Sequence, residues 1–224
     1  MAREYKGRNA SDIALEAPAD SYAWHIFQAR SWIDLLHREQ NASGIHYAAI
    51  HLRYGIEYLM FELLVITGKL VNRSEYEKCI GRKVALERLL KKNEPNYEKL
   101  IEFSKALNSI QQLGVRLIYW PLSDLMRYWG VASEFLHFFG SHEETYKNER
   151  WLLASSARLE SVISEIWKEL EENDAIGVFD IDRLQPEAKR SWEDYSTGKI
   201  DIENVKLRMK IAHPIIRNRK LNKS

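Results

Sequence analysis

The most apolar stretch of the chain is residues 45–66, with the sequence IHYAAIHLRYGIEYLMFELLVI. Sixteen of its 22 residues are apolar, and the exceptions include Arg53, Glu57 and Glu62. An arginine and two carboxylates would be costly at membrane depth, so we expect a buried helix rather than a membrane span. Apolar residues cover more than one stripe of this helix, which predicts a largely enclosed position near the centre of a helical domain.

Helical periodicity continues on both sides of this stretch. Helices are predicted over about 21–38, 43–68, 93–114, 122–139, 149–173, 186–195 and 201–213. One more helix is predicted to begin with the capping-box pattern of residues 74–77. Residues 178–181 are predicted to form a short extended piece or a turn. Pro214 is expected to end the last helix, because proline disfavours helical backbone at the preceding residue. The pattern predicts an all-α fold, with a multi-helix bundle over residues 1–183 and a helical extension with a basic tail over residues 184–224.

The composition excludes several classes of protein. The 224 residues carry 33 Lys and Arg against 32 Asp and Glu, a net charge of +1, so the chain is not a globally basic nucleic-acid coat. One cysteine, Cys79, excludes an intrachain disulfide, a cysteine zinc site and a CxxC redox pair. A single cysteine fits the reducing cytosol, and the chain begins without the apolar region of a signal peptide. We therefore expect a cytoplasmic protein with no cofactor and no membrane contact.

Charge is segregated near the end of the chain. Residues 165–182 have a net charge of −6, whereas residues 205–224 hold seven Lys and Arg and no Asp or Glu. One interpretation is a solvated helix face followed by a frayed tail. The other is a basic tail that contacts RNA phosphates or an acidic patch on a partner protein.

Two of the predicted helices each carry a line of polar residues. Arg53 and Glu57 share a face of the central helix, and Arg127, Glu134 and His137 follow helical spacing in the helix over 122–139. These lines are either the solvent edges of their helices, or they face one another and form a polar cluster in a cleft. In a cleft, histidine would serve as a general acid or base and arginine would stabilise a phosphoryl oxyanion.

A metal or a small ligand is a further alternative for this polar cluster. Glu134-Phe-Leu-His137 has the Glu-x-x-His form of di-metal bundles, which need a second such motif, and the chain has none. The remaining form of this alternative is a single metal or small-ligand site among Glu57, Glu134 and His137.

The first two predicted helices resemble a known family. Ala23-Trp24, Ala29-Arg30 and Leu35-Leu36 precede His46-Tyr-Ala-Ala-Ile-His-Leu-Arg-Tyr-Gly-Ile-Glu57-Tyr-Leu. Residues 19–66 with these matches resemble the opening of HEPN domains, the higher-eukaryote and prokaryote nucleotide-binding family. The resemblance implies a helical protein that acts on or binds RNA, and a metal-independent endoribonuclease of bacterial toxin or antiphage type. It also implies a catalytic Arg followed after four to six residues by a His, in a site completed by two dimer partners.

Two Arg–His pairs of this chain fit the spacing that the family implies. They are Arg30 with His37 and Arg208 with His213, whereas nine residues separate Arg127 from His137. We take Arg208 and His213 as the candidate catalytic residues because they lie in the basic segment, although Met209 departs from the polar residue expected there. His213 would act as acid or base on the ribose 2′-OH or the leaving oxygen, and Arg208 would steady the phosphate.

The quaternary state and the partners are predicted from the family resemblance and from the residue composition of the helices. The resemblance and the many aromatic residues on helices lead us to expect a homodimer, with RNA bound by the basic tail. The alternative function is a noncatalytic helical interaction or assembly module that recruits a protein partner.

Overall fold

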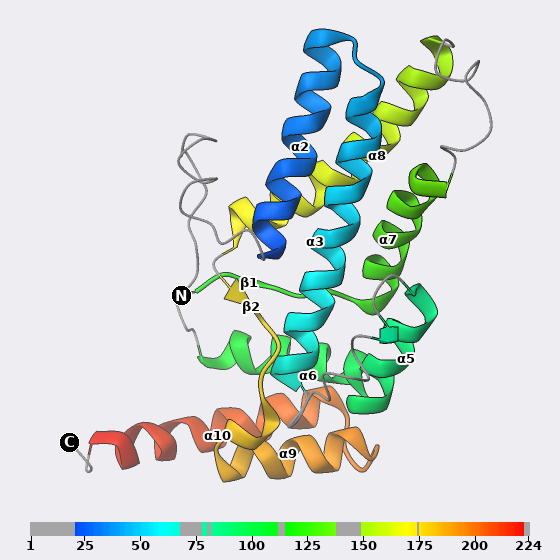
Figure 1. Cartoon of the computed structure of the whole chain (residues 1–224). Coiled ribbons are helices and arrows are strands. Elements are labelled where there is room, and N and C mark those ends of the chain that lie inside the picture. Colours follow the sequence, from blue (N-terminus) through cyan, green and yellow to red (C-terminus); the bar gives the residue numbers. More distant parts are fainter. Residues whose placement is uncertain are drawn as a thin grey trace.

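A computed structural model of the chain confirms the all-α fold (Figure 1). It describes residues 21–67, 78–79, 82–111, 115–137, 149–173 and 175–221, and the side chains of all these except 83, 84, 111, 137, 149 and 213–221. The helices are α2 (Tyr22–Glu39), α3 (Ser43–Thr67), α5 (Lys83–Asn93), α6 (Tyr97–Gln111), α7 (Leu122–His137), α8 (Glu149–Glu172), α9 (Pro186–Ser196) and α10 (Ile202–Leu221). The capping-box pattern at residues 74–77 lies outside the described residues.

Helices α2 and α3 form a closely packed antiparallel hairpin (Figure 1). Ser21 caps α2 by accepting a hydrogen bond from the Trp24 backbone N–H at 3.1 Å, whereas the sequence allows either Asp20 or Ser21 as the cap. Gln40 ends α2 in the left-handed conformation, with φ of 50°. Gly44 lets the helices approach, since a Cβ atom there would lie 2.8 Å from the Trp32 carbonyl oxygen.

Helix α3 lies at the centre of the bundle, where the sequence predicts it. It packs against α2, α5, α7 and α8, and Figure 1 shows α8 crossing behind the α2–α3 hairpin with α7 beside α3. Leu52, Met60 and Leu63 on α3 are fully buried. Burial of several such side chains, each contributing about 1.5–3 kcal/mol, gives the bundle its main stabilising term.

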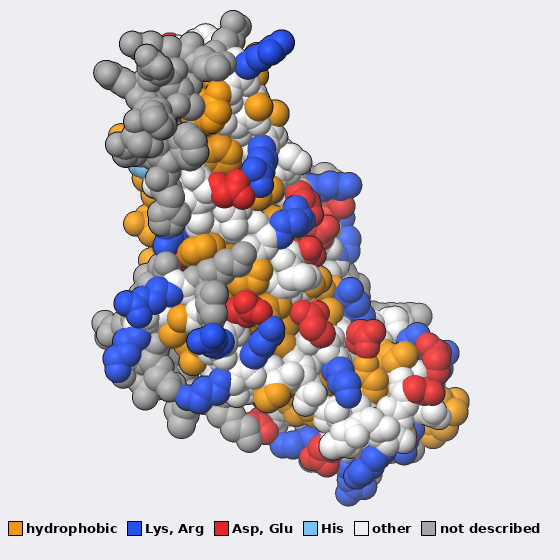
Figure 2. All heavy atoms as spheres, turned by 90° about the vertical axis from the view of Figure 1, so that its right-hand side faces the viewer, with side chains coloured by type: hydrophobic (Ala, Val, Ile, Leu, Met, Phe, Trp, Pro, Cys, Tyr) orange, Lys and Arg blue, Asp and Glu red, His pale blue; other side chains and the backbone are white. Residues whose placement is uncertain are grey.

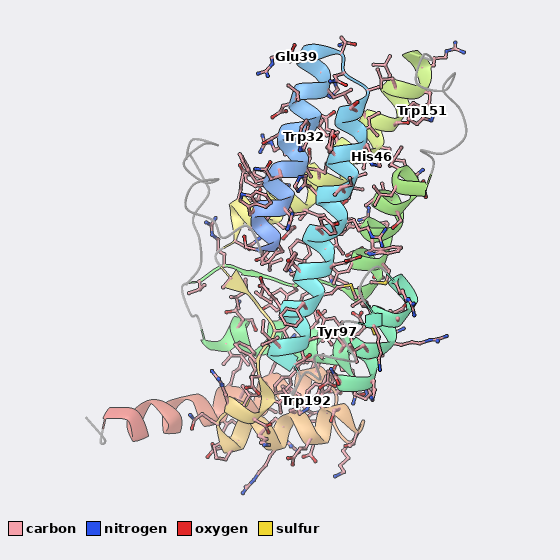
Figure 3. All side chains as sticks on the ribbon, in the orientation of Figure 1. Trp32, Glu39, His46, Tyr97, Trp151 and Trp192 are labelled. Carbon is pink, nitrogen blue, oxygen red and sulfur yellow. The ribbon has the colours of Figure 1, made fainter. Side chains whose placement is uncertain are left out.

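Helices α9 and α10 form a lower layer on α6 (Figure 1). Trp192 of α9, labelled in Figure 3, packs edge-on against Phe103 of α6, with ring centroids 5.3 Å apart. Tyr195 of α9 donates a hydrogen bond to the Glu102 carboxylate of α6. The C-terminal extension therefore rests on the bundle through both aromatic and polar contacts.

Two short strands join distant parts of the chain. Strand β1 (Leu117–Ile118) pairs in parallel with β2 (Ala175–Ile176), and the 3-10 helix η3 (Ile181–Arg183) follows. The sequence predicts an extended piece or turn at 178–181 and misses the strand at 175–176. A strand of two residues has no periodicity to detect, so only its partner fixes it.

Helix α10 corrects the predicted helix end at His213. The helix continues through Pro214 to Leu221. Proline's fixed φ is compatible with helical backbone, and its cost is one lost hydrogen bond and crowding of the carbonyl four residues earlier. Val205, Met209 and Ala212 anchor the first half of α10 by burial. The basic residues up to Lys220 therefore stand on a helix that projects beyond α9 (Figure 1).

Candidate functional site

One part of the predicted polar cluster forms a buried junction between α3 and α7. Arg53 Nε lies 3.0 Å from Glu57 Oε1, and the Trp129 indole N–H donates to the same oxygen at 3.1 Å. The Arg53 guanidinium carbon lies 4.7 Å from the centroid of the Trp129 ring. The side chains of Arg53 and Glu57 are only 17% and 6% exposed. This is a satisfied buried ion pair rather than the solvent edge of a helix.

The two predicted lines of polar residues do not face one another. Arg127 pairs with Glu165 of α8 at 2.6 Å, and Glu134 pairs with Arg158 of α8 at 2.6 Å. These four side chains are about half exposed. Arg127 and Glu134 therefore point toward α8 instead of Glu57, because α7 contacts α8 along a face distinct from the one that carries Trp129. His137 belongs to α7, but its side chain lies outside the described residues.

The surface over α7 and α8 accordingly mixes the two signs of charge. Figure 2 shows acidic and basic side chains interspersed on this side of the molecule. Burial alone would raise the pKa of Glu165, but hydrogen bonds from Arg127 and from the Tyr128 hydroxyl outweigh burial and lower it. The charged groups here form ion pairs between α7 and α8 at the surface of the bundle.

The candidate catalytic arginine is held by a carboxylate. Arg208 Nη1 lies 2.7 Å from Asp194 Oδ2 of α9. Hydrogen bonding from Arg208 lowers the pKa of Asp194. Met209, where the family pattern has a polar residue, is buried. The arginine thus joins α10 to α9 in this structure.

The position of His213 differs from the sequence-based picture. Because α10 continues past it, positions 208 and 213 lie about 140° apart around the helix axis. The His213 side chain lies outside the described residues. Within one chain, the helix therefore does not place these two positions on a common face.

The second Arg–His pair of suitable spacing also contacts α8. Arg30 lies 3.9 Å from Glu171, with its guanidinium 5.2 Å from the Trp167 ring centroid, and His37 lies 3.1 Å from Glu160. Both residues share a face of α2, as their spacing indicates. Their partners show that this face packs on α8.

Sequence reasoning missed a histidine pair between α2 and α3. The Nδ1 atoms of His25 and His51 are 3.1 Å apart, so one ring donates its N–H to the other. His25 is buried and stacks on Tyr58, with ring centroids 5.2 Å apart. Burial lowers the pKa of His51. The 4, 3 and 4 spacing of Tyr47, His51, Tyr54 and Tyr58 was the available signal.

No metal site of three or more His, Cys, Asp or Glu groups occurs among the described residues. Glu57 and Glu134, which the sequence groups as potential ligands, belong to separate ion pairs. In the same part of the chain, no helix is both long and apolar enough to cross a membrane.

Comparison with known proteins identifies no family for this chain, so its class is defined by the fold alone. The chain matches no protein-family model, and no curated protein or solved structure matches it. The class that the structure defines is a helical bundle with a projecting basic helix.

Proposed function

We propose that the protein binds RNA through the basic C-terminal part of α10. The observation that carries this proposal is the length of the helix, which extends to Leu221 and holds most of the seven basic residues of the acid-free segment 205–224. The rest of the chain has 26 Lys and Arg against 32 Asp and Glu, a net charge of −6. A local concentration of Lys and Arg attracts phosphates and releases their counterions.

The spacing of the basic residues suits a linear polyanion. Residues 206, 210, 213, 217 and 220 follow steps of 4, 3, 4 and 3, which is the spacing of positions along one helical face. Two cations near the body have carboxylate partners, Lys206 with Glu203 and Arg208 with Asp194. The proposal therefore assigns phosphate binding to exposed Lys210 and to the basic positions beyond it.

Binding can be tested with a charge-matched pair of variants. Neutralising Arg217, Arg219 and Lys220 to Gln should weaken binding of a single-stranded RNA, measured by fluorescence anisotropy, and reduce the salt slope by about 2. The control neutralises Lys168, Arg183 and Lys189, which carry the same charge on other elements. Equal losses in both triple variants would show a net-charge effect and contradict the proposal, as would full binding by the first.

Whether the protein also cleaves RNA can be tested with the same single-stranded RNA. Cutting that persists in chelator and disappears in His213→Ala would extend the proposal to a metal-independent endoribonuclease. Intact RNA would leave binding as the activity. The 2.7 Å pair between Arg208 and Asp194 supports RNA binding without cleavage. A phosphate would have to compete with the Asp194 carboxylate before Arg208 could act as a catalytic group.

A second candidate function is assembly with another copy of the chain. An aromatic face runs along α2 and α3 and consists of Trp24, Trp32, Tyr47, His51, Tyr54 and Tyr58. Trp32 and Tyr47 stack with centroids 4.6 Å apart, and Tyr47 and Tyr54 are 45% and 47% exposed. Aromatic enrichment without charge is typical of interface cores, and an uncharged face can meet its own copy without repulsion.

Light scattering tests this second candidate. We expect a dimer that becomes a monomer when Tyr47 and Tyr54 are both changed to Glu. The control changes Val65 and Leu153, which are also exposed apolar residues, to Glu. A monomeric parent, or dissociation by both double variants, would contradict assembly through the aromatic face.

A further inference from the structure

Helix α10 carries apolar residues on two opposite sides. Val205, Met209 and Ala212 are buried on the side that packs on the bundle. Leu207 and Ile211, one turn apart, are 57% and 64% exposed. At about 100° per residue, this second pair lies roughly opposite the buried side. A surface helix normally has one apolar face, so the outer pair belongs to a face that the packing of the described residues leaves uncovered.

The outer residues have the spacing of a coiled-coil seam. Positions 207, 211, 214, 218 and 221 follow steps of 4, 3, 4 and 3, and they hold Leu, Ile, Pro, Asn and Leu. All five lie on α10, which extends past α9 (Figure 1). Positions 211 and 218 are then a positions of a heptad, and the other three are d positions. A stripe confined to a and d is the narrow seam of helix pairing, rather than the wide apolar face of a helix on a membrane surface.

The positions that flank this seam are basic. Arg208 takes an e position, and Lys210 and Arg217 take g positions. Segment 205–224 contains no Asp or Glu to offset these charges. The charges at e and g decide which partner helix a coiled coil accepts. Two copies of α10 would bring cations together, so the seam is complementary to an acidic helix and not to its own copy.

We propose that the outer face of α10 docks an amphipathic helix of another protein, with apolar residues at its a and d positions and Glu or Asp at its e and g positions. Leu207 and Ile211 pack between the apolar side chains of this partner, and its carboxylates pair with Lys210 and Arg217. The seam from position 207 to position 221 is about 21 Å long, so a partner helix of about two heptads covers it.

Docking at this seam also has a consequence for RNA. An acidic helix on the seam covers Lys210 and Arg217, which belong to the basic positions assigned to phosphate binding above. The partner helix and RNA should therefore compete for α10. This competition rests on the proposed RNA binding, whereas docking of the helix does not.

A designed peptide is the probe for the docking site. It has about three heptads, with Leu at a and d and Glu at e and g, and the matched peptide has Lys in place of Glu. Fluorescence anisotropy with the whole chain should show binding of the Glu peptide and at least about tenfold weaker binding of the Lys peptide. Equal affinity for both peptides, or no binding of the Glu peptide at about 100 µM, would overturn the proposal.

Substitutions in the protein separate the apolar seam from attraction by charge alone. Leu207→Ala combined with Ile211→Ala should reduce the affinity for the Glu peptide by about tenfold or more, while alanine preserves the helix. The matched control combines Val65→Ala with Leu153→Ala, which removes exposed apolar side chains from α3 and α8. Its affinity should equal that of the parent. Full affinity in the seam variant, or an equal loss in the control, would contradict docking at the seam.

RNA binding by the same variants distinguishes the two proposals. The variant with Leu207→Ala and Ile211→Ala keeps every basic residue, so it should bind the single-stranded RNA as the parent does. A loss of RNA affinity would show that the outer face belongs to the RNA surface and would contradict docking of a helix. Displacement of bound RNA by the Glu peptide would support both proposals. If the peptide binds and the RNA does not, RNA binding by α10 fails and the docking site stands.

Two other occupants of the seam are also outcomes of the test. Vesicles of anionic phospholipid that bind through Leu207 and Ile211, without binding of the Glu peptide, would assign the face to a lipid surface. A dimer in light scattering that dissociates in the variant with Leu207→Ala and Ile211→Ala would assign it to a second copy. Either result would overturn the acidic helix as the occupant.

Discussion

The indole N–H of Trp129 on α7 donates to the Glu57 carboxylate on α3 at 3.1 Å. Arg53, four residues before Glu57, contacts the same oxygen and lies over the Trp129 ring. One buried carboxylate therefore connects the two most apolar helices of the bundle. Its removal leaves a largely buried arginine without its counter-charge, so this junction is sensitive to loss of a single member.

The first prediction concerns this junction. Glu57→Ala should lower the free energy of unfolding by about 3 kcal/mol, because a buried charge loses its partner. Glu134→Ala should lower it by less than about 1 kcal/mol, since Glu134 and its partner Arg158 are half exposed. Urea denaturation of both variants measures the difference. Equal losses would contradict the contrast between a buried and an exposed pair.

A second prediction tests the close approach of α2 and α3. A Cβ atom at Gly44 would lie 2.8 Å from the Trp32 carbonyl oxygen and 2.9 Å from Leu36 Cβ. Gly44→Ala should lower the free energy of unfolding by about 1–3 kcal/mol despite alanine's better helix propensity, because the helices must separate. Ser43→Ala, at the exposed neighbouring position, is the control. Gly44→Ala of parental stability would mean that the hairpin is packed less closely.

The third prediction concerns a buried hydroxyl. Tyr97 donates to the Trp120 carbonyl oxygen at 2.9 Å, which fixes the start of α6 against the segment before α7. Tyr97→Phe should cost about 1–2 kcal/mol, because the carbonyl loses its partner away from water. Tyr47→Phe, at a 45% exposed position, should have little effect on the same denaturation curve.

The fourth prediction concerns pH. Burial lowers the pKa values of His46 and His51 from the ordinary value of 6.5. As the pH falls through 6.5, the unfolded chain takes up protons that the folded chain does not, so stability should decrease until the folded pKa values are reached. The lowered pKa values of Glu165 and Asp194 cause a separate loss only below about 4.5.

Urea denaturation at about pH 7.5 and about pH 5.5 measures the histidine contribution. His51→Gln should make the loss of stability between these two pH values smaller. A loss as large as in the parent would exclude His51 as a source. His37→Gln, at an exposed position on α2, is the control histidine.

Much of the fold follows from local sequence. Apolar periodicity predicts α2, α3, α6, α7, α8 and α9 within a few residues at both ends. A helix that buries a face must repeat its apolar residues every three to four positions. A cap expected at Asp20 or Ser21 fits the start of α2 at Tyr22, and Pro186 at the first turn of α9 fits the expected helix there. Where local rules compete with tertiary packing, as at Pro214, the local rule alone gave the wrong helix end.

The candidate site was less accessible from the sequence. Helical spacing places Arg53 with Glu57, and Arg127 with Glu134, on shared faces of their own helices. Helical spacing does not predict the hydrogen bond from Trp129 to Glu57. It also does not predict that Arg127 and Glu134 pair with residues of α8, which are Glu165 and Arg158. A cavity lined by Glu134 of α7 and Trp151 of α8 likewise depends on these helices lying together, since the two residues are 17 positions apart in the chain.

The sequence by itself determined the all-α class, the central position of α3 and the concentration of positive charge in the last twenty residues. These properties depend on the types of residue that lie close together in the chain. Only the tertiary structure decided which charges are buried, which are paired and which line a cavity. The physical reason is that the energy of a charge depends on the groups and the water around it. In this bundle, those groups come from helices distant in sequence.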